Sequence, residues 1–230
     1  MMEPASLDFR IIQSLARLQT KPLLVDAIDR LSQNALVNGF VFVVPLFLIW
    51  HFAEPSRRWL AQRLLVAIVL ATIFGILGSL LLQQFIRWPP PSSHPALVGI
   101  YSPVFQDNHN PSSFPSDSAI LFSIVAFGLA AWNRGVGLGL LTWLLIFVGP
   151  VKIFVGGHYP SDILAGLVIG YLSVQLSNCL VRRFHSIEDL ASNHSLPFRV
   201  GMFLWLFEIG NEFRDLTDLL SGLHHIQRHF

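Results

Sequence analysis

The feature that most constrains the fold is a set of five apolar stretches that contain no Asp, Glu, Lys or Arg. A helix needs about 20 apolar residues to cross the hydrocarbon core of a bilayer, where unpaired backbone groups are costly. Buried helices of a soluble protein would account for one such stretch but not for five. We therefore predict an all-α, polytopic membrane helix bundle with about five transmembrane helices. The expected spans are residues 35–53, 64–86, 118–133, 135–151 and 163–181.

Composition supports a membrane protein and argues against several other classes. Apolar residues make up 53% of the chain and charged residues only 13%, against roughly a quarter charged in soluble domains. The net charge of +1 predicts no nucleic-acid partner. Cys179 is the single cysteine, so the chain has no internal disulfide. Three histidines near the C-terminus have no acidic or cysteine companions, so we expect a solvated tail there and not a metal site; they are His224, His225 and His229.

The basic residues that flank the expected spans predict the orientation of the chain. Cytoplasmic loops of membrane proteins are enriched in Lys and Arg. With five spans, three groups of arginines fall on one side, which should be the cytoplasm. The opposite side then receives a long loop at 87–117 and a short connection at 156–162. The arginines are Arg57, Arg58 and Arg63 after the first span, Arg134 after the third, and Arg182 and Arg183 after the fifth.

These patterns divide the chain into three parts. Residues 35–183 should form the transmembrane bundle. Residues 1–34 carry apolar side chains at helical spacing with charged residues between them, which predicts amphipathic helices lying in the membrane interface. Residues 184–230 should form a cytoplasmic or interfacial tail. Within this tail the apolar run 197–210 is too short to span, so we expect an interfacial or docking helix there.

The loop at 87–117 is rich in proline and cannot be helical. It ends in Ser-Phe-Pro-Ser-Asp-Ser at positions 113–118, directly before the third expected span. Free backbone N–H groups and hydroxyls at the start of a helix are suited to binding an anion, above all phosphate. Ser and Asp are also ordinary helix caps, so capping alone is the competing interpretation of this motif.

A second motif, Gly-Gly-His-Tyr-Pro-Ser-Asp at 156–162, lies between the fourth and fifth spans. His158 and Asp162 are four residues apart and would share one helical face. A carboxylate near one imidazole nitrogen fixes the tautomer and leaves the other nitrogen available as a nucleophile or base. Lys152 adds a cation six residues before the histidine. The competing interpretation is an interfacial histidine and a capping aspartate.

Together the two motifs resemble the membrane branch of the type-2 phosphatidic acid phosphatase and haloperoxidase superfamily. The Phe-Pro-Ser-Asp form is similar to the bacitracin-resistance type of undecaprenyl-pyrophosphate phosphatase, and the resemblance covers roughly residues 60–181. It implies a lipid phosphate substrate held in the membrane and neither a metal nor another cofactor. The expected location is the inner (cytoplasmic) membrane, with the active site facing its extracytoplasmic side.

The resemblance also implies roles for individual residues. His158 would be the nucleophile that forms a phosphohistidine, and Asp162 would orient and polarise it. Lys152 stands at the position of the family's phosphate-binding Arg and keeps the charge without the two-pronged guanidinium. Ser116 and the backbone around Asp117 would hold the phosphate.

The sequence departs from the family pattern at all three motifs, and in the third Val151 replaces a serine. Ser118 occupies the catalytic position of the family's general-acid histidine, and the first motif retains only Arg87, expected to bind substrate, with the prolines that follow it. General-acid catalysis contributes roughly 10²–10⁴-fold, and its loss matters least when the leaving group is a stable anion. A lipid pyrophosphate, with undecaprenyl pyrophosphate first, is therefore favoured over a monoester unless His94, His109 or Asp117 supplies the proton.

Two alternatives remain open on the sequence. A catalytically decayed family member would bind a phospholipid headgroup or a protein partner, which the altered motif positions favour. A transporter would show ionisable residues in the middle of its spans or a repeated architecture, and the sequence shows neither.

Overall fold

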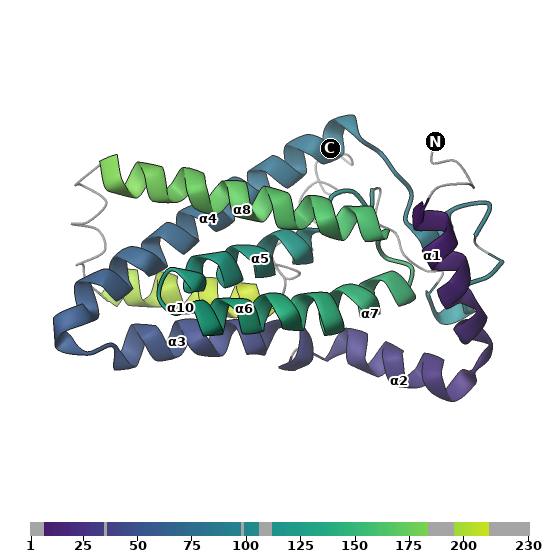
Figure 1. Cartoon of the computed structure of the whole chain (residues 1–230), viewed down its shortest axis with the longest axis horizontal. Helices are drawn as coiled ribbons and strands as arrows, with labels where there is room; N and C mark the ends of the chain where they lie inside the picture. The colour runs from purple at the N-terminus through teal and green to yellow at the C-terminus, as the bar shows by residue number, and fades with distance from the viewer. Residues whose placement is uncertain (1–6, 35, 98, 106–111, 184–195, 212–230) are drawn as a thin grey trace, which may run out of the picture.

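The computed structural model describes residues 7–34, 36–97, 99–105, 112–183 and 196–211. All the regular elements in these residues are helical, which confirms the all-α class. Short 3-10 and π segments join some of the helices. The α-helices are α1 (Leu7–Ala16), α2 (Pro22–Gln33), α3 (Val41–Phe52), α4 (Arg58–Phe85), α5 (Asp117–Ala130), α6 (Arg134–Trp143), α7 (Gly149–Phe154), α8 (Pro160–Arg183) and α10 (Leu196–Gly210) (Figure 1).

Three helical segments of the described residues are long and apolar enough to cross a membrane, and a fourth is counted if a bent pair forms one span. The pair combines α2 with the segment that contains α3, at an angle of 56°. The third expected span forms α5, which has only 14 residues and is shorter than a full crossing. The three long segments are Pro55–Phe85, Arg134–Phe154 and Pro160–Arg183.

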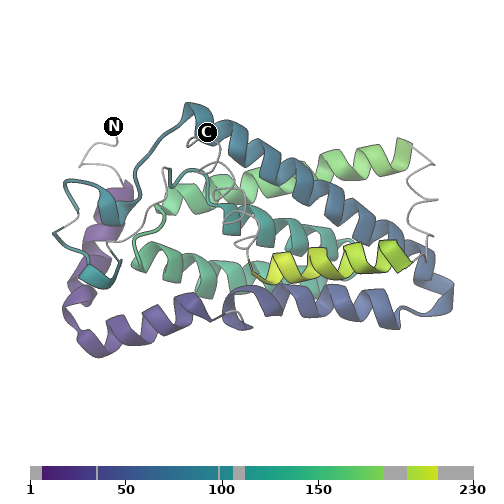
Figure 2. The same ribbon diagram turned by 180° about the vertical axis from the view of Figure 1, so that it is seen from behind.

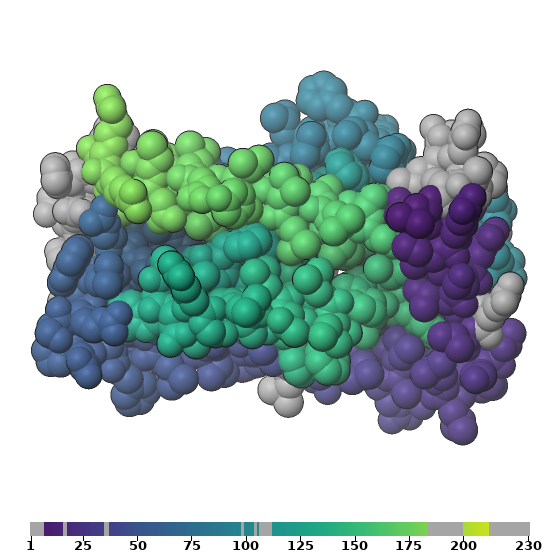
Figure 3. Space-filling view, viewed as in Figure 1, coloured from purple at the N-terminus to yellow at the C-terminus, as the bar shows by residue number. Residues whose placement is uncertain are grey.

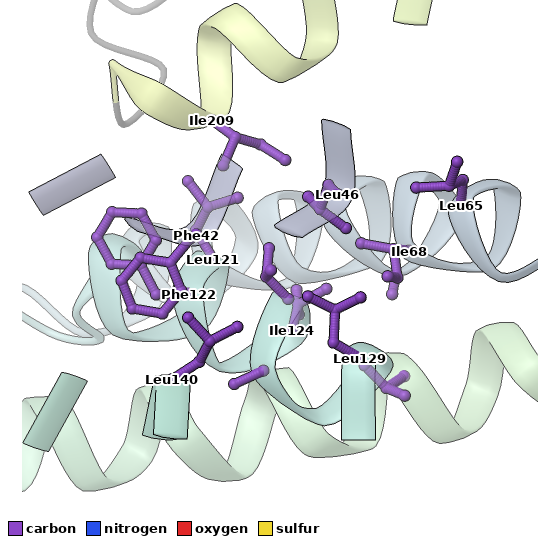
Figure 4. Packing of buried hydrophobic residues seen from close by; sticks show 14 of the residues in the cluster. Phe42, Leu46, Leu65, Ile68, Leu121, Phe122, Ile124, Leu129, Leu140 and Ile209 are labelled. Atoms are coloured by element: carbon purple, nitrogen blue, oxygen red, sulfur yellow. The ribbon is translucent and has the colours of Figure 1, made fainter. Parts of the chain in front are cut away.

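The short helix α5 forms the centre of the bundle. It is apolar on all sides, and nearly every one of its side chains is buried against the helices around it. Phe122 of α5 stacks on Phe42 of α3 with ring centroids 4.3 Å apart (Figure 4). A Cβ atom on Gly166 of α8 would lie 2.6 Å from the Cβ atom of Ala119, and one on Gly170 would overlap Ser123. These glycines let α8 approach α5 closely, which places the start of α8 beside the start of α5.

The first helices cover the end of the bundle that carries the proline-rich loop. α1 crosses this end (Figures 1 and 3) and buries Phe9 and Ile12 in a cluster with Tyr159. The carboxylate of Asp8 also accepts a hydrogen bond from the backbone N–H of Ser161, at 3.2 Å, in the first turn of α8. The helices expected in residues 1–34 are therefore present, and α1 is tied to the bundle by a polar contact as well as an apolar one.

The last described helix, α10, packs alongside α3 (Figure 2). Met202, Leu206 and Ile209 belong to the same buried cluster as the core of α3 and α5. The apolar run in the tail thus forms a helix that docks on the bundle. The rest of the tail, residues 184–195 and 212–230, lies outside the described residues, and so do its three histidines.

Candidate active site

The structure brings the two sequence motifs together, although they lie about forty residues apart in the chain. The backbone N–H of Ser116 donates a hydrogen bond to the carbonyl oxygen of Asp162 at 3.2 Å. Nδ1 of His158 lies 2.8 Å from the carbonyl oxygen of Ser113. The N–H of Ser113 is itself bound to the carbonyl of Trp88 at 2.7 Å, at the start of the same loop. The end of the loop is thus held against the connection between α7 and α8.

The contact with Ser113 determines which nitrogen of His158 carries a proton. A carbonyl oxygen can only accept a hydrogen bond, so Nδ1 must be the donor and Nε2 of the neutral ring has a free lone pair. The imidazole is 15% exposed, which keeps it accessible at the end of the bundle.

The sequence predicted that the carboxylate of Asp162 fixes the tautomer of His158. The distance between the two side chains in the structure corrects this prediction. Its Oδ2 lies 3.8 Å from Nδ1 of His158, which is too far for a hydrogen bond but close enough for a strong electrostatic interaction. Oδ2 instead accepts a hydrogen bond from the N–H of Tyr159 at 2.8 Å. Sequence reasoning could not identify the carbonyl of Ser113, because every residue carries one.

Asp162 is completely buried, and its Oδ1 has no hydrogen-bond partner among the described residues. A buried carboxylate of this kind is stable only when a compensating charge or donor lies nearby. The N–H of Tyr159 is one such donor, at 2.8 Å from Oδ2, and the imidazole of His158 lies at 3.8 Å from the same oxygen as a group that can carry a positive charge. The carboxylate is therefore positioned to favour any state in which that ring is positively charged.

The turn that carries His158 depends on a glycine. Gly156 has φ of +74°, and a Cβ atom there would lie 2.7 Å from both Ser92 and Tyr101. Its carbonyl accepts a hydrogen bond from the N–H of Ser92 at 3.0 Å, which attaches the proline-rich loop to the turn. The carbonyl of Lys152 accepts from the N–H of His158 at 3.4 Å. Backbone groups therefore fix the histidine from several sides.

The start of α5 shows the capping that the sequence allowed. The hydroxyl oxygen of Ser116 accepts a hydrogen bond from the N–H of Ala119 at 3.4 Å, as an N-cap does. Ser118 is buried in the first turn. The carboxylate of Asp117 is bound by the hydroxyl of Ser79 and by the Gln83 amide at 3.4 Å, so it is directed to α4. Phosphate binding by Ser116 and Asp117 stays a prediction.

A cavity of about 460 Å³ opens beside the histidine turn. Arg87 and Tyr159 both line it, so the arginine of the first motif lies near the neighbour of His158. His94 also lines the cavity, and its Nδ1 accepts from the N–H of Ala96 at 3.2 Å, which places the ring proton on Nε2. Burial raises the pKa of Tyr159, and the nearby Asp162 and Asp8 raise it further, so its hydroxyl stays protonated at neutral pH. The whole lining is Arg87, Trp88, Pro89, His94, Pro95, Ala96 and Tyr159.

One contact of the site could not be predicted from the sequence, and one residue named in the sequence analysis lies outside the described part of the chain. The contact between Asp8 and α8 joins residues far apart in sequence, and no sequence pattern announces it. His109, one of the possible proton donors, is outside the described residues. Within the described part of the chain, no three His, Cys, Asp or Glu side chains gather closely enough to hold a metal ion.

The fold and the site define a polytopic helical membrane protein in which an accessible histidine lies against a buried carboxylate beside a proline-rich loop. The family model described as the PAP2 superfamily matches residues 63–186. The chain therefore belongs to the PAP2 superfamily, and the match includes both motifs and the helices that hold them.

Individual relatives are more distant. The chain is 28% identical over 137 residues to the bacitracin transport permease protein BcrC of Bacillus licheniformis, across 58% of this chain and 62% of that protein, which is less than two thirds of its length. It is 25% identical over 151 residues to YbjG of Escherichia coli (strain K12), named as a candidate undecaprenyl-diphosphatase, across 61% and 69%. A crystal structure of a transmembrane PAP2-type phosphatidylglycerolphosphate phosphatase from Bacillus subtilis covers 80% of this chain and 98% of its own, at 18% identity and a TM-score of 0.34.

Proposed function

We propose that this chain is a phosphohydrolase of membrane lipid phosphates or pyrophosphates, with undecaprenyl pyrophosphate as the first candidate substrate. Membership of the superfamily and the name of the relative YbjG support the class and the substrate. The observation that carries the proposal is the position of His158. One ring nitrogen is engaged by the carbonyl of Ser113 at 2.8 Å, so that in the neutral ring the other nitrogen carries a lone pair and can act as a nucleophile.

In the proposed reaction, Nε2 of His158 attacks the terminal phosphorus of the lipid. The bond between that phosphorus and the bridging oxygen breaks, and its electron pair stays on the oxygen of the departing lipid. The ring then carries a phosphoryl group on Nε2, a proton on Nδ1 and a positive charge. Asp162, at 3.8 Å from Nδ1, stabilises this charge without taking the proton. Water next attacks phosphorus, the P–N bond breaks, and phosphate is released while the proton of the water passes to solvent.

Cations and hydrogen-bond donors would stabilise the charge on the transferring phosphoryl group. We assign this role to Arg87 and Lys152, supported by Ser116 and the backbone of Asp117. A serine such as Ser118 is no acid near neutral pH, so the leaving oxygen must tolerate a negative charge. The lipid monophosphate released from a pyrophosphate does so, whereas an alkoxide does not.

Phosphate release from purified full-length protein in detergent tests this proposal, with undecaprenyl pyrophosphate and undecaprenyl phosphate as substrates. We expect faster release from the pyrophosphate. His158→Ala should lower release to background, a loss of roughly 10³-fold or more for removal of a nucleophile. His51→Ala is the matched control, because His51 is exposed on α3. Equal release by the wild type and His158→Ala would overturn the proposal, and faster release from the monophosphate would overturn the choice of substrate.

The replacement of the family's histidine by Ser118 favours a second candidate, a binding protein that has lost catalysis. Ser118→His distinguishes the two functions. A wild type that shows no turnover while Ser118→His releases phosphate identifies a decayed enzyme. Turnover by the wild type excludes the second candidate, and Ser118→His should then extend activity towards monoesters.

We also propose that the site faces the extracytoplasmic side of the inner membrane, because six arginines in the connections between and after the spans lie at the other end: Arg57, Arg58, Arg63, Arg134, Arg182 and Arg183. A single engineered cysteine offers a direct test. Cys179 lies inside the expected span 163–181, so it is replaced by alanine, and Arg183→Cys places the thiol just beyond that span at the end of α8. A membrane-impermeant thiol reagent should label this cysteine only after the cells are permeabilised. Labelling of intact cells would reverse the orientation.

A further inference from the structure

At the end of the bundle opposite to the start of α8, α4 begins and α8 ends (Figure 1). A second cavity lies there, between these two helices. Its volume is about 210 Å³. Most of α8 separates it from the candidate active site, since the helix rises roughly 27 Å over the 18 residues from Pro160 to Asn178 at about 1.5 Å per residue. The proposed reaction uses none of the residues that line this cavity.

One wall of the cavity is a single face of α4. Leu60, Arg63, Leu64 and Ala67 line it, and their spacing of three, four and seven residues places them on one side of a helix. Arg63 therefore shares one side of α4 with two leucines and an alanine. This wall offers a positive charge among apolar side chains.

The opposing wall is built in the same way from α8. Asn178, Val181 and Arg182 are separated by three and four residues and line the cavity together. Ala131, at the end of α5, lines a third side. One turn deeper, the hydroxyl of Ser177 donates to the carbonyl of Ala67 and fixes the distance between α4 and α8. The cavity is thus a built feature in which small residues leave space between two arginines.

The chemistry of the lining suits a phosphate ester attached to an apolar molecule. Two guanidinium groups offer several N–H donors in the planar arrangement that matches phosphate oxygens, and Asn178 adds an amide. Leucine, valine and alanine side chains complete the walls. Tyr171, seven residues before Asn178 on the same face of α8 and 46% exposed, continues this wall along the helix away from the cavity. A free anion would need the arginines but not this apolar surface.

We propose that this cavity binds the phosphate headgroup of an anionic phospholipid from the leaflet at that end of the bundle. Further arginines at the same end raise the local concentration of anionic lipid, since each contributes attraction to a negative membrane surface. Arg57, Arg58 and Arg134 stand at the starts of α4 and α6. This ligand is a second lipid, distinct from any substrate held near His158.

Native mass spectrometry of the full-length protein tests the proposal, with phosphatidylglycerol and phosphatidylcholine of identical acyl chains as probes. We expect several-fold higher retention of phosphatidylglycerol by the wild type. Arg63→Gln and Arg182→Gln should each reduce it about fivefold, as expected for roughly one arginine contact to an anionic headgroup. Arg183→Gln is the matched control, because it removes the same charge from the neighbouring position outside the cavity lining.

A second variant separates the cavity from charge alone. Ala131 is exposed, so Ala131→Leu should fill part of the cavity without disturbing the core or any charge. It should reduce retention of phosphatidylglycerol as the arginine variants do. Equal retention of the two lipids, a loss in Arg183→Gln as large as in Arg182→Gln, or no effect of Ala131→Leu would each overturn the proposal. Displacement of the lipid by millimolar inorganic phosphate would identify a free-phosphate site and overturn the lipid assignment.

Discussion

His158 and Arg182 stand near opposite ends of α8, and what holds each side chain is different. The imidazole of His158 contacts the carbonyl of Ser113 and lies near the buried carboxylate of Asp162. The backbone N–H of His158 donates a hydrogen bond to the carbonyl of Lys152. Arg182 extends from an exposed helical face towards a cavity with mostly apolar walls. One end of the bundle restricts a ring to a single orientation, and the other presents long cationic side chains on regular helices.

This difference matches two kinds of task. Attack on phosphorus requires a nucleophile within a few tenths of an ångström of the productive position, which rigid backbone contacts supply. Retention of a lipid headgroup requires charge and space, and flexible arginines tolerate variation in the ligand. Substitutions at the histidine end should therefore cost far more activity than substitutions at the arginine end.

The largest effect after loss of His158 itself should come from Asp162→Asn. The amide can still accept the hydrogen bond from Tyr159, but it cannot stabilise a positive imidazole. We expect phosphate release to fall by about 10²–10⁴-fold, as for the loss of a carboxylate that supports a catalytic histidine. Asp26→Asn is the control, because Asp26 is exposed on α2 and pairs only locally with Arg30. A loss of less than threefold in Asp162→Asn would show that the ring needs no carboxylate.

A smaller but still large effect is expected from Gly156→Ala. The positive φ costs an alanine about 1–2 kcal/mol, and the new methyl group would press on Ser92 and Tyr101. The turn should shift, with a drop of at least tenfold in phosphate release and a lower Tm in detergent. Gly139→Ala provides the comparison, since no atom lies within 4 Å of a Cβ atom at that helical position. Equal activity in both variants would show that the histidine turn is not held rigidly.

Gly170→Ala should weaken the close packing of α8 against α5 inside the bundle. A methyl group there would overlap the hydroxyl of Ser123 inside the bundle. Overpacking of this kind costs about 1–3 kcal/mol of stability. The Tm should fall, and activity should fall less than in Gly156→Ala because the site residues keep their own contacts. Thermal unfolding measured together with phosphate release checks the order, and a larger activity loss than in Gly156→Ala would contradict it.

Much of the framework could be predicted from the sequence, because charge-free apolar runs report directly on membrane helices. The stretches 64–86 and 163–181 reappear as parts of α4 and α8. The motif at 156–162 also predicted a histidine near a carboxylate, since a spacing of four is a local property of helices. Local patterns were sufficient wherever the interaction is itself local.

The remainder depended on contacts between distant segments. The carbonyl of Ser113 has no side-chain signature, so only the fold shows that it holds His158. The central position of α5, buried by the helices around it, also depends on contacts between distant segments. The arginine cavity required the relative rotation of α4 and α8, because Arg63 and Arg182 are more than a hundred residues apart. From the sequence alone, these basic residues predicted only the orientation of the chain in the membrane.

The smallest effect should follow Arg57→Gln. The guanidinium of Arg57 lies 4.3 Å from the centroid of the Trp132 ring, an exposed cation–π contact at the arginine end. Such contacts contribute about 0.5–1 kcal/mol at exposed sites, so the Tm should fall by only a few degrees. Phosphate release should stay within twofold of the wild type, because the substitution lies at the far end of α4 from Arg87. A large loss of activity here would mean that the two ends are coupled through the bundle, and the contrast between a rigid chemical end and a tolerant cationic end would no longer hold.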